Sequence, residues 1–387
     1  MTSLEAGSSS GAASELVAGV GGLATAVAEH RGEFDSNGRL PDDLFEQLAT
    51  LGLFRLLLPS SVGGPGLSAL EFMDVVEAAS ALDGTIGWLV GNGGGMARVG
   101  AYLPAESVRE IFDDPLAFVV SSTGAVGRAV RVAGGYSVSG RWPFGSGSPH
   151  GTWFSPICAV EQNGQATGEV IFVYAPRKDV VLHDNWRVSG LCATGSVDFE
   201  LGEVFIPDRF AHVFQPEPTQ PGTLYRLPTR SIFTWTVATV PLGIAAGAID
   251  DFATTAGSAK RRGDSVPLAE RDLNQSQLGQ VLARTAASRA YLRHTMGTML
   301  DGIEAGIGLE ASRVDFRLAC TFASQSALWA INLVTEMAGA VAILRSSPLE
   351  RRERDARAAA KHIAMSPAAY ITGGKLRLGC DLSNVSF

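Results

Sequence analysis

A glycine- and serine-rich break after an aromatic stretch carries the residue types best suited to hold a flat, edge-polar ligand. Residues 136–144 are rich in aromatic and β-branched side chains, which favours a strand, and GSGSP at 145–149 then interrupts it. Ser146 offers a hydroxyl and a backbone N–H, and the flanking glycines let the backbone approach a ligand closely. With His150 and the aromatic residues after it, this pattern suits the isoalloxazine ring of a flavin. A hairpin with a Gly/Ser turn is the alternative.

Two further runs of residues carry recognisable spacing. The first holds Asp184, Trp186 and the sequence GL at 190–191, followed by TGS at 194–196 and VFIP at 204–207. The second lies near the end of the chain and holds PL at 348–349, RD at 354–355, His362 and Gly379.

The three runs, in this order, resemble the acyl-CoA dehydrogenase superfamily. The version GRWPFGSGSPHGTW at 140–153 is similar to one branch of it, the flavin-dependent monooxygenases that receive reduced flavin from a separate reductase. That branch includes p-hydroxyphenylacetate hydroxylase and dibenzothiophene monooxygenase. The resemblance implies an α+β fold with an N-terminal helical domain, a middle β-barrel and a C-terminal four-helix bundle, assembled as a homotetramer.

The resemblance also implies the chemistry and the residues that carry it. Reduced FMN or FAD would react with O2 to give a C4a-(hydro)peroxyflavin that oxidises a small organic substrate, without a metal. Ser146 would lie near flavin N5 and His362 on the C4a side, as the catalytic residues. Arg354 and Asp355 are expected to pair with each other and hold the C-terminal helix, with a solvated surface pair as the alternative. The residues expected to bind the flavin are Trp142, Phe144, Ser146, Gly147, Trp186, Thr194, Gly195, Ser196 and Arg262.

Candidates for the substrate pocket come from the early helix, the flavin segment and the start of the bundle. They are Trp88, Asn92, Met96, His150, Phe233 and Trp235. His150 could instead cap the turn after Ser146. Phenol hydroxylases of the similar branch often carry a histidine on the early helix, whereas residues 91–96 here read GNGGGM. A simple phenol is therefore disfavoured, and an aromatic natural product, a heteroarene, a thioether or an amine remains open.

Two other functions stay open for a chain of this superfamily. An acyl-CoA dehydrogenase or oxidase needs a glutamate base over the flavin, but neither residues 232–242 nor the run YITGG at 370–374 contains an acid. A flavin-binding member without catalysis is the other alternative. The chain has no G-x-G-x-x-G motif at a strand–helix junction, so a separate NAD(P)H:flavin reductase is expected as partner.

Composition excludes several other classes. The 387 residues carry a net charge of −8 and no basic run, which argues against nucleic acid and anionic membranes as partners. The four cysteines form no C-x-x-C pair, which fits reduced thiols in the cytoplasm better than a metal site or a disulfide framework. The apolar run at 232–249 contains Pro241 and several threonines, so we expect a buried bundle helix there rather than a membrane span.

Periodicity along the chain gives the expected domains. Residues 1–14 are Ser/Gly/Ala-rich and predict a disordered tail, and residues 15–115 have helical spacing. Strand-like patterns follow over 116–212, with separate strands expected at 118–121 and 130–132. Long helical segments return over 224–387, with lengths suited to a four-helix bundle.

Overall fold

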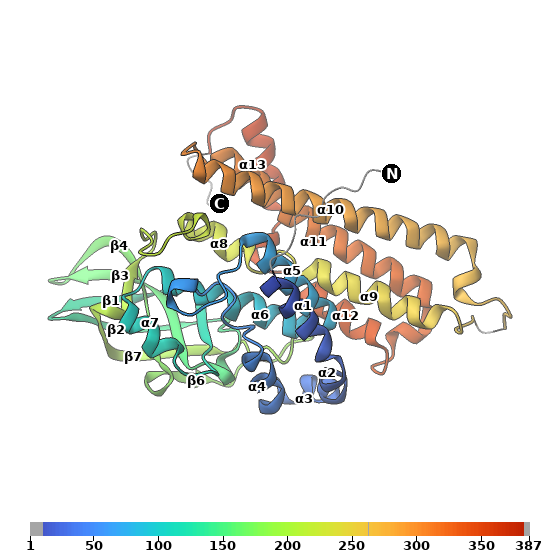
Figure 1. Cartoon of the computed structure of the whole chain (residues 1–387), viewed down its shortest axis with the longest axis horizontal. Helices are drawn as coiled ribbons and strands as arrows, with labels where there is room; N and C mark the ends of the chain where they lie inside the picture. Colours follow the sequence, from blue (N-terminus) through green and yellow to red (C-terminus); the bar gives the residue numbers. More distant parts are fainter. Residues whose placement is uncertain (1–10, 262, 383–387) are drawn as a thin grey trace. The chain divides into compact units, whose positions relative to one another are not determined.

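The structure is a computed structural model that describes residues 11–261 and 263–382. It confirms the predicted α+β acyl-CoA dehydrogenase-like architecture of N-terminal helices, a central sheet and C-terminal helices (Figure 1). The described residues form two compact units. The first comprises residues 11–72, 89–188 and 192–229, and the second comprises 73–88, 189–191, 230–261 and 263–382.

The described residues of the amino-terminal half form seven α-helices, and the first of them begins earlier than expected. They are α1 (Gly11–Gly22), α2 (Ala24–His30), α3 (Phe34–Asn37), α4 (Asp42–Thr50), α5 (Ala69–Leu82), α6 (Gly84–Met96) and α7 (Ala105–Phe112). Helix α1 therefore starts inside the stretch predicted as a tail, and residues 1–10 lie outside the described part of the chain. Helix α4 begins after Pro41 with two aspartates in its first turn, where carboxylates interact favourably with the helix dipole.

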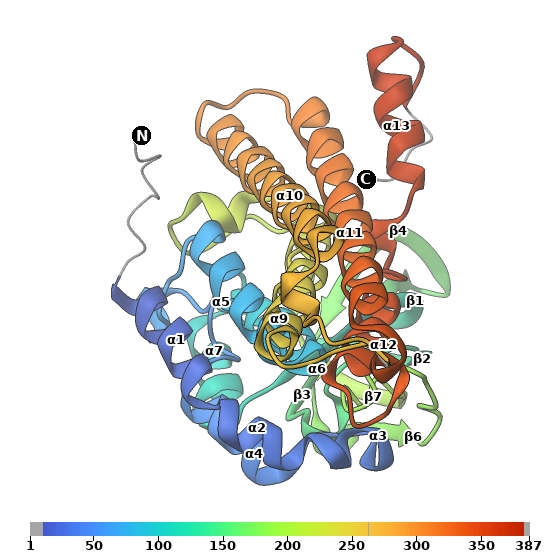
Figure 2. The same cartoon turned by 90° about the vertical axis from the view of Figure 1, so that its right-hand side faces the viewer.

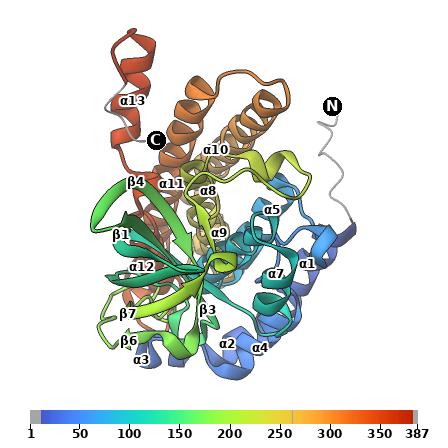
Figure 3. The ribbon, with the colours of Figure 1, turned by 90° about the vertical axis from the view of Figure 1, so that its left-hand side faces the viewer.

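The central sheet belongs to the first unit and contains eight strands. They are β1 (Val119–Val132), β2 (Gly135–Trp142), β3 (Trp153–Gln162), β4 (Gln165–Val173), β5 (Ala175–Pro176), β6 (Val181–His183), β7 (Asp198–Pro207) and β8 (Ala211–Val213). The strands pair in the order β6-β7-β2-β1-β3-β4-β8, and β5 pairs with β3. Figure 3 shows part of this sheet, with β1, β4, β6 and β7 among its labelled strands. Strands β1 and β3 run parallel, while the remaining pairs are antiparallel.

One strand prediction was wrong. The two short strands expected at 118–121 and 130–132 are one continuous strand, β1. The small polar residues between them, which read as a break, are accommodated by a shift of register against β3 between Ser122 and Gly127. Gly127 is needed there because a Cβ would lie 2.1 Å from the indole of Trp142.

The second unit is built from long helices. They are α8 (Thr229–Trp235), α9 (Val240–Ala256), α10 (Asp272–Glu304), α11 (Glu310–Ala338), α12 (Pro348–Ala359) and α13 (Ala368–Arg377). Helices α9 to α12 pack on one another, and α13 packs on α11 (Figure 2). The bundle buries continuous apolar faces such as Val314, Ala323 and Ile331 of α11.

Two helical stretches of the described chain are long and apolar enough to cross a membrane by length and composition, Thr229–Ala256 and Glu310–Ile343. The apolar window of the first is 83% buried inside the chain, which confirms the burial expected at 232–249. The single helix expected there is wrong, because the stretch is divided between α8 and α9. The window of the second is only 39% buried. A large apolar surface of α11 is therefore left uncovered by its own chain.

Candidate functional site

The break predicted after the aromatic strand is joined to the second motif by backbone hydrogen bonds, all within the first unit. The N–H of Gly145 donates to Val197 O at 3.0 Å, and the N–H of Gly147 donates to Thr194 O at 2.7 Å. These bonds place the segments 145–147 and 194–197 side by side, although about 50 residues of chain separate them. The structure thus brings together the two runs from which the flavin site was predicted.

A chain of hydroxyl groups lies at this junction. Ser146 Oγ is 2.9 Å from Ser196 Oγ, which is 2.7 Å from Thr194 Oγ1. All three side chains are buried, with at most 9% of each residue exposed. Gly195, between the last two, has a φ of 52°, which glycine adopts without strain. The hydroxyls position one another, so Ser196 and Thr194 orient the Ser146 hydroxyl.

An exposed aromatic ring stands next to these hydroxyls in the chain. Phe144 has a φ of 60°, which is unusual for a bulky residue, and it is 67% exposed. Its ring meets the ring of Trp186 edge-on, with centroids 6.3 Å apart, and the Trp186 indole N–H donates to Cys192 O at 3.0 Å. An exposed aromatic in a strained backbone conformation is more often found at functional sites than in ordinary turns.

Trp142, unlike Phe144, lies in the core. It is fully buried, its indole N–H donates to Ile157 O at 3.0 Å, and its ring stacks on Phe199. These contacts make its side chain part of the core that supports the end of β2. The side chains that the structure offers to a flavin are therefore Phe144, Ser146 and Trp186, with Thr194 and Ser196 behind Ser146.

These residues fit a flavin by their chemistry. An isoalloxazine ring needs apolar contact on its face and hydrogen-bond partners along its polar edge, and Phe144 with Ser146 supplies one group of each kind. Gly147 fixes the geometry, because its φ is 83° and a Cβ there would lie 2.3 Å from the Phe118 ring.

Replacing Gly147 with alanine should destabilise the protein by about 2–5 kcal/mol, the sum of backbone strain and overpacking against Phe118. Gly164→Ala is the matched control, because Gly164 has a φ of 78° but nothing within 4 Å of its Cβ position. The control should lose only the strain contribution of about 1–2 kcal/mol. Urea denaturation measures both, and equal losses would show that Gly147 is not tightly packed.

His150 is held by neighbouring residues of the first unit. Its Nε2–H donates to Leu40 O at 3.1 Å, and its ring stacks on Phe45 with centroids 4.1 Å apart. Burial, reinforced by Arg39, lowers its pKa to about 4, so the ring is neutral at pH 7. These contacts tie His150 to Leu40 and to α4, and its side-chain hydrogen bond is not made to the turn after Ser146 that was expected as its alternative partner.

Asn92 and Met96 lie on α6, in the portion that belongs to the first unit. Met96 is buried, and its sulfur accepts a hydrogen bond from Arg98 at 3.2 Å. Close packing explains why Gly93 and Gly94 stand between these residues. A Cβ at Gly93 would lie 2.4 Å from the Phe118 ring, and one at Gly94 would lie 2.7 Å from Leu53 O.

The remaining candidates lie in the second unit. His362 Nδ1 accepts the backbone N–H of Ala364 at 3.2 Å, so the ring proton resides on Nε2. Burial, with a smaller contribution from Arg317, lowers the pKa of His362 to about 4. The ring is edge-on to Trp88, with centroids 5.6 Å apart. His362 is thus a neutral hydrogen-bond donor through Nε2 at pH 7.

Phe233 and Trp235 lie on the short helix α8 of the same unit. Trp235 is fully buried and belongs to the core, whereas Phe233 is partly exposed. Arg262 lies outside the described residues. His362 and Trp88 are two predicted site residues that the second unit brings into contact.

The pairing expected between Arg354 and Asp355 is wrong. Arg354 instead forms an ion pair with Glu350 one turn earlier on α12, at 2.7 Å. Asp355 is 2% exposed, and its Oδ1 accepts the N–H of Leu191 at 2.7 Å. Burial and the nearby carboxylate of Asp83 raise the pKa of Asp355 to about 7. Adjacent residues on a helix point in different directions, which is why they found different partners.

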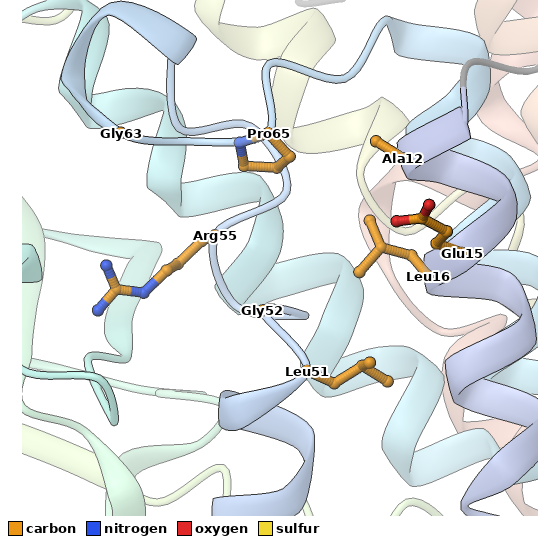
Figure 4. A pocket seen from close by; sticks show the side chains of 8 residues that line it. All are labelled: Ala12, Glu15, Leu16, Leu51, Gly52, Arg55, Gly63 and Pro65. Carbon is orange, nitrogen blue, oxygen red and sulfur yellow. The ribbon is translucent and has the colours of Figure 1, made fainter.

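A pocket of about 340 Å³ lies in the first unit, away from these candidates in the sequence (Figure 4). Its walls come from α1 and from the segment between α4 and α5, and the side chains that line it include Glu15, Leu16 and Arg55. It shares no lining residue with the predicted flavin segment.

The sequence did not reveal Arg313 and Arg317, of which Arg317 lies close to His362. They are one turn apart on α11, a spacing that puts them on one face of the helix. Arg317 Nη2 donates to Ile363 O, the residue after His362, at 2.8 Å. The i, i+4 spacing of these two like charges was the one sequence signal that could have identified them as candidate site residues.

Comparisons with known proteins agree with this architecture. Residues 19–103 match the family model of the acyl-CoA dehydrogenase N-terminal domain, and residues 235–367 match that of the C-terminal domain. The indole-3-acetate monooxygenase of Acinetobacter baumannii is 28% identical over 356 residues, with 90% of both chains covered. The oxygenase component of the FADH2-dependent resorcinol hydroxylase of a Rhizobium species is 27% identical, with 91% of this chain and 90% of the relative covered.

A solved structure shows the same fold along the whole chain. XiaF from a Streptomyces species, in complex with FADH2 and glycerol, superposes with a TM-score of 0.88 at 23% identity, covering 97% of this chain and 98% of XiaF. The two family models match in their natural order and together span more than half of the sequence. The chain belongs to the acyl-CoA dehydrogenase superfamily.

Proposed function

We propose that this protein is the oxygenase component of a two-component flavin monooxygenase. One observation carries the proposal: the exposed Phe144 ring lies beside the Ser146–Ser196–Thr194 hydroxyl chain. Two relatives support it, one named as a monooxygenase and one as the oxygenase component of an FADH2-dependent hydroxylase, because each matches about 90% of this chain. Reduced FMN or FAD, when bound, would supply the electrons that activate O2. A separate NAD(P)H:flavin reductase would supply the reduced flavin.

The chain's own residues have distinct tasks in this proposal. Phe144 and Trp186 give apolar contact to the flavin ring, and Ser146 offers a hydroxyl oriented by Ser196 and Thr194. His362, neutral with its proton on Nε2, would offer that proton as a hydrogen-bond donor on the side where oxygen reacts. Trp88, which meets His362 edge-on, excludes water there.

The substrate is a small organic molecule, and the named relatives point to aromatic compounds. Indole-3-acetate is a suitable first probe because a relative is named for it, and indole-3-acetamide is its neutral counterpart. The alternatives are an acyl-CoA dehydrogenase or oxidase and a non-catalytic flavin-binding member, but nothing in the site favours either. Residues 232–242 and 370–374 contain no acid to serve as the α-proton base.

Anaerobic titration separates these functions. The protein should bind reduced FMN or FADH2 with a saturable change in flavin absorbance, and admitting O2 with substrate should yield oxidised substrate without NAD(P)H. Bleaching of bound oxidised flavin by acyl-CoAs would overturn the proposal in favour of a dehydrogenase. Failure to bind either flavin in either redox state would overturn it in favour of a structural role.

We also propose a homotetramer. The apolar window at Glu310–Ile343 is only 39% buried, and Val341, Ile343 and Leu344 at its end are each more than half exposed. Such a surface is typical of a subunit interface. Multi-angle light scattering at micromolar concentration should give about four times the 40.5 kDa chain mass, and a monomer would contradict the proposal.

A cytoplasmic location is proposed as well. The four cysteines, all within the described residues, form no disulfide, and Cys158, Cys192 and Cys320 are buried, which suits a reducing compartment.

A further inference from the structure

A cluster of arginines lies beside His362 in the second unit, and no part of the proposed flavin chemistry uses it. Arg313 and Arg317 project from α11 toward α8. Arg313 Nε donates to Ser231 Oγ at 3.2 Å, and Arg317 Nη1 donates to Thr234 Oγ1 at 3.1 Å. Arg230, at the start of α8, is close enough to act electrostatically on Arg313. Three positive charges thus converge on one short helix.

The partners of Arg317 are neutral. Its guanidinium donates to the Thr234 hydroxyl and to the carbonyl of Ile363, and among the described residues it forms no ion pair with a carboxylate. Other arginines of the bundle are paired differently, since Arg289 bonds to Glu77 and Arg352 to Asp251. A half-buried guanidinium with only neutral acceptors keeps most of its attraction for an anion.

The electrostatics of the cluster point the same way. Burial lowers the pKa of Arg317, and burial with the charges of Arg230 and Arg317 lowers the pKa of Arg313. Both shifts mean that the protonated side chains are held at a cost which a bound anion would remove. The planar guanidinium fork binds a carboxylate or a phosphate in a bidentate manner, so the cluster is suited to one of these two anions.

The position of the cluster indicates that the anion would be part of the substrate. Arg317 bonds to the carbonyl of Ile363, the residue that directly follows His362, and the His362 ring contacts Trp88. Phe233, partly exposed, lies on α8 between the two residues that accept from the arginines. An anion bound here would therefore lie in the same part of the unit as the predicted substrate residues Trp88 and Phe233.

We propose that Arg313 and Arg317, assisted by Arg230, form a specificity site that binds the carboxylate of an anionic aromatic substrate. The inference rests on the proposed oxygenase function and adds to it the substrate class, an aromatic acid in its ionised form. Ser231 and Thr234 hold the two guanidinium groups in place through their hydroxyls. The apolar part of the acid is recognised by Trp88 and Phe233.

The test compares an acid with its neutral amide. Calorimetric titration of the full-length protein with indole-3-acetate and indole-3-acetamide should show tighter binding of the acid, with an affinity that falls as salt is added. Arg313→Gln/Arg317→Gln should weaken binding of the acid by about 10- to 100-fold, the loss of one charge-assisted interaction, and leave the amide within about threefold. Arg357→Gln, which removes an exposed arginine paired with Glu353, is the control for net charge and should change neither.

Further measurements on the double variant separate other roles for the cluster. Equal weakening of acid and amide would mean that the arginines only hold α8 in place, and would overturn the proposal. A loss confined to reduced FMN, with riboflavin unaffected, would assign the cluster to a flavin phosphate instead. A fall in molecular mass by light scattering with unchanged acid binding would assign it to a subunit contact. Retention of flavin binding alongside loss of acid binding keeps this inference distinct from the proposed function.

Discussion

Replacing Ser146 with alanine is expected to raise the H2O2 released per reduced flavin consumed by about 2- to 10-fold, with a matching loss of oxidised product. That range corresponds to one neutral hydrogen bond, worth about 0.5–1.5 kcal/mol net. The fold should be nearly unaffected, because Ser196 keeps its other partner, Thr194, and the backbone bonds at Gly145 and Gly147 remain. Parallel assays of peroxide and product measure the partition.

Ser148→Ala is the matched control for this experiment. Ser148 lies two residues away, is fully buried, and its hydroxyl donates to Gly145 O at 2.6 Å. Its removal should lower the melting temperature while changing the ratio of product to peroxide less than Ser146→Ala does. If Ser146→Ala left the ratio unchanged and lowered the melting temperature by several degrees, Ser146 would be a turn residue and the assignment of the flavin segment would fail.

Asp355→Asn is expected to stabilise the protein at pH 8 and to have little effect near pH 4. Burial and Asp83 raise the pKa of Asp355 to about 7, against roughly 3.9 in an unfolded chain. Between these values the folded state binds more protons than the unfolded state, so stability falls as pH rises, by up to about 1.4 kcal/mol per pH unit, and levels off above pH 7. Asparagine carries no charge at any of these pH values, and its carbonyl can still accept the Leu191 N–H.

Urea denaturation at several pH values checks this prediction. Asp251→Asn is the contrasting variant, because Asp251 is paired with Arg352 and its loss should destabilise the protein at pH 8. A larger destabilisation by Asp355→Asn at pH 8 than at pH 5 would show that Asp355 is held as a carboxylate by its neighbouring arginines, contrary to the expectation.

The strand and the break that form the proposed flavin segment were predictable from the sequence because their signals are local. The aromatic and β-branched residues before Gly145 define a strand, and the glycines and serines after it define a break. The same local logic failed at β1, where SSTGAVG at 121–127 also reads as a break. There the pairing with β3 tolerates a register shift, and tertiary pairing overrides a weak local preference.

The charged residues of the second unit were less predictable, because their partners lie far away in the sequence. Asp355 accepts a hydrogen bond from Leu191 and lies near the carboxylate of Asp83. Arg317 donates hydrogen bonds to Thr234 and Ile363. No spacing rule links positions that meet only through the packing of different helices. Sequence reasoning therefore paired Asp355 with its neighbour Arg354 and missed Arg313 and Arg317 entirely.

The most direct test of the oxygenase function is to follow an oxygen atom. The protein is mixed with chemically reduced FMN or FADH2, ¹⁸O2 and a panel of aromatic acids, without reductase or NAD(P)H, and the products are examined by mass spectrometry. The account predicts that one ¹⁸O atom enters an aromatic acid, and that Ser146→Ala lowers the labelled product while peroxide rises. The account would be contradicted if all the reduced flavin were oxidised at the rate seen without protein, with the O2 recovered as H2O2 and no label in any acid.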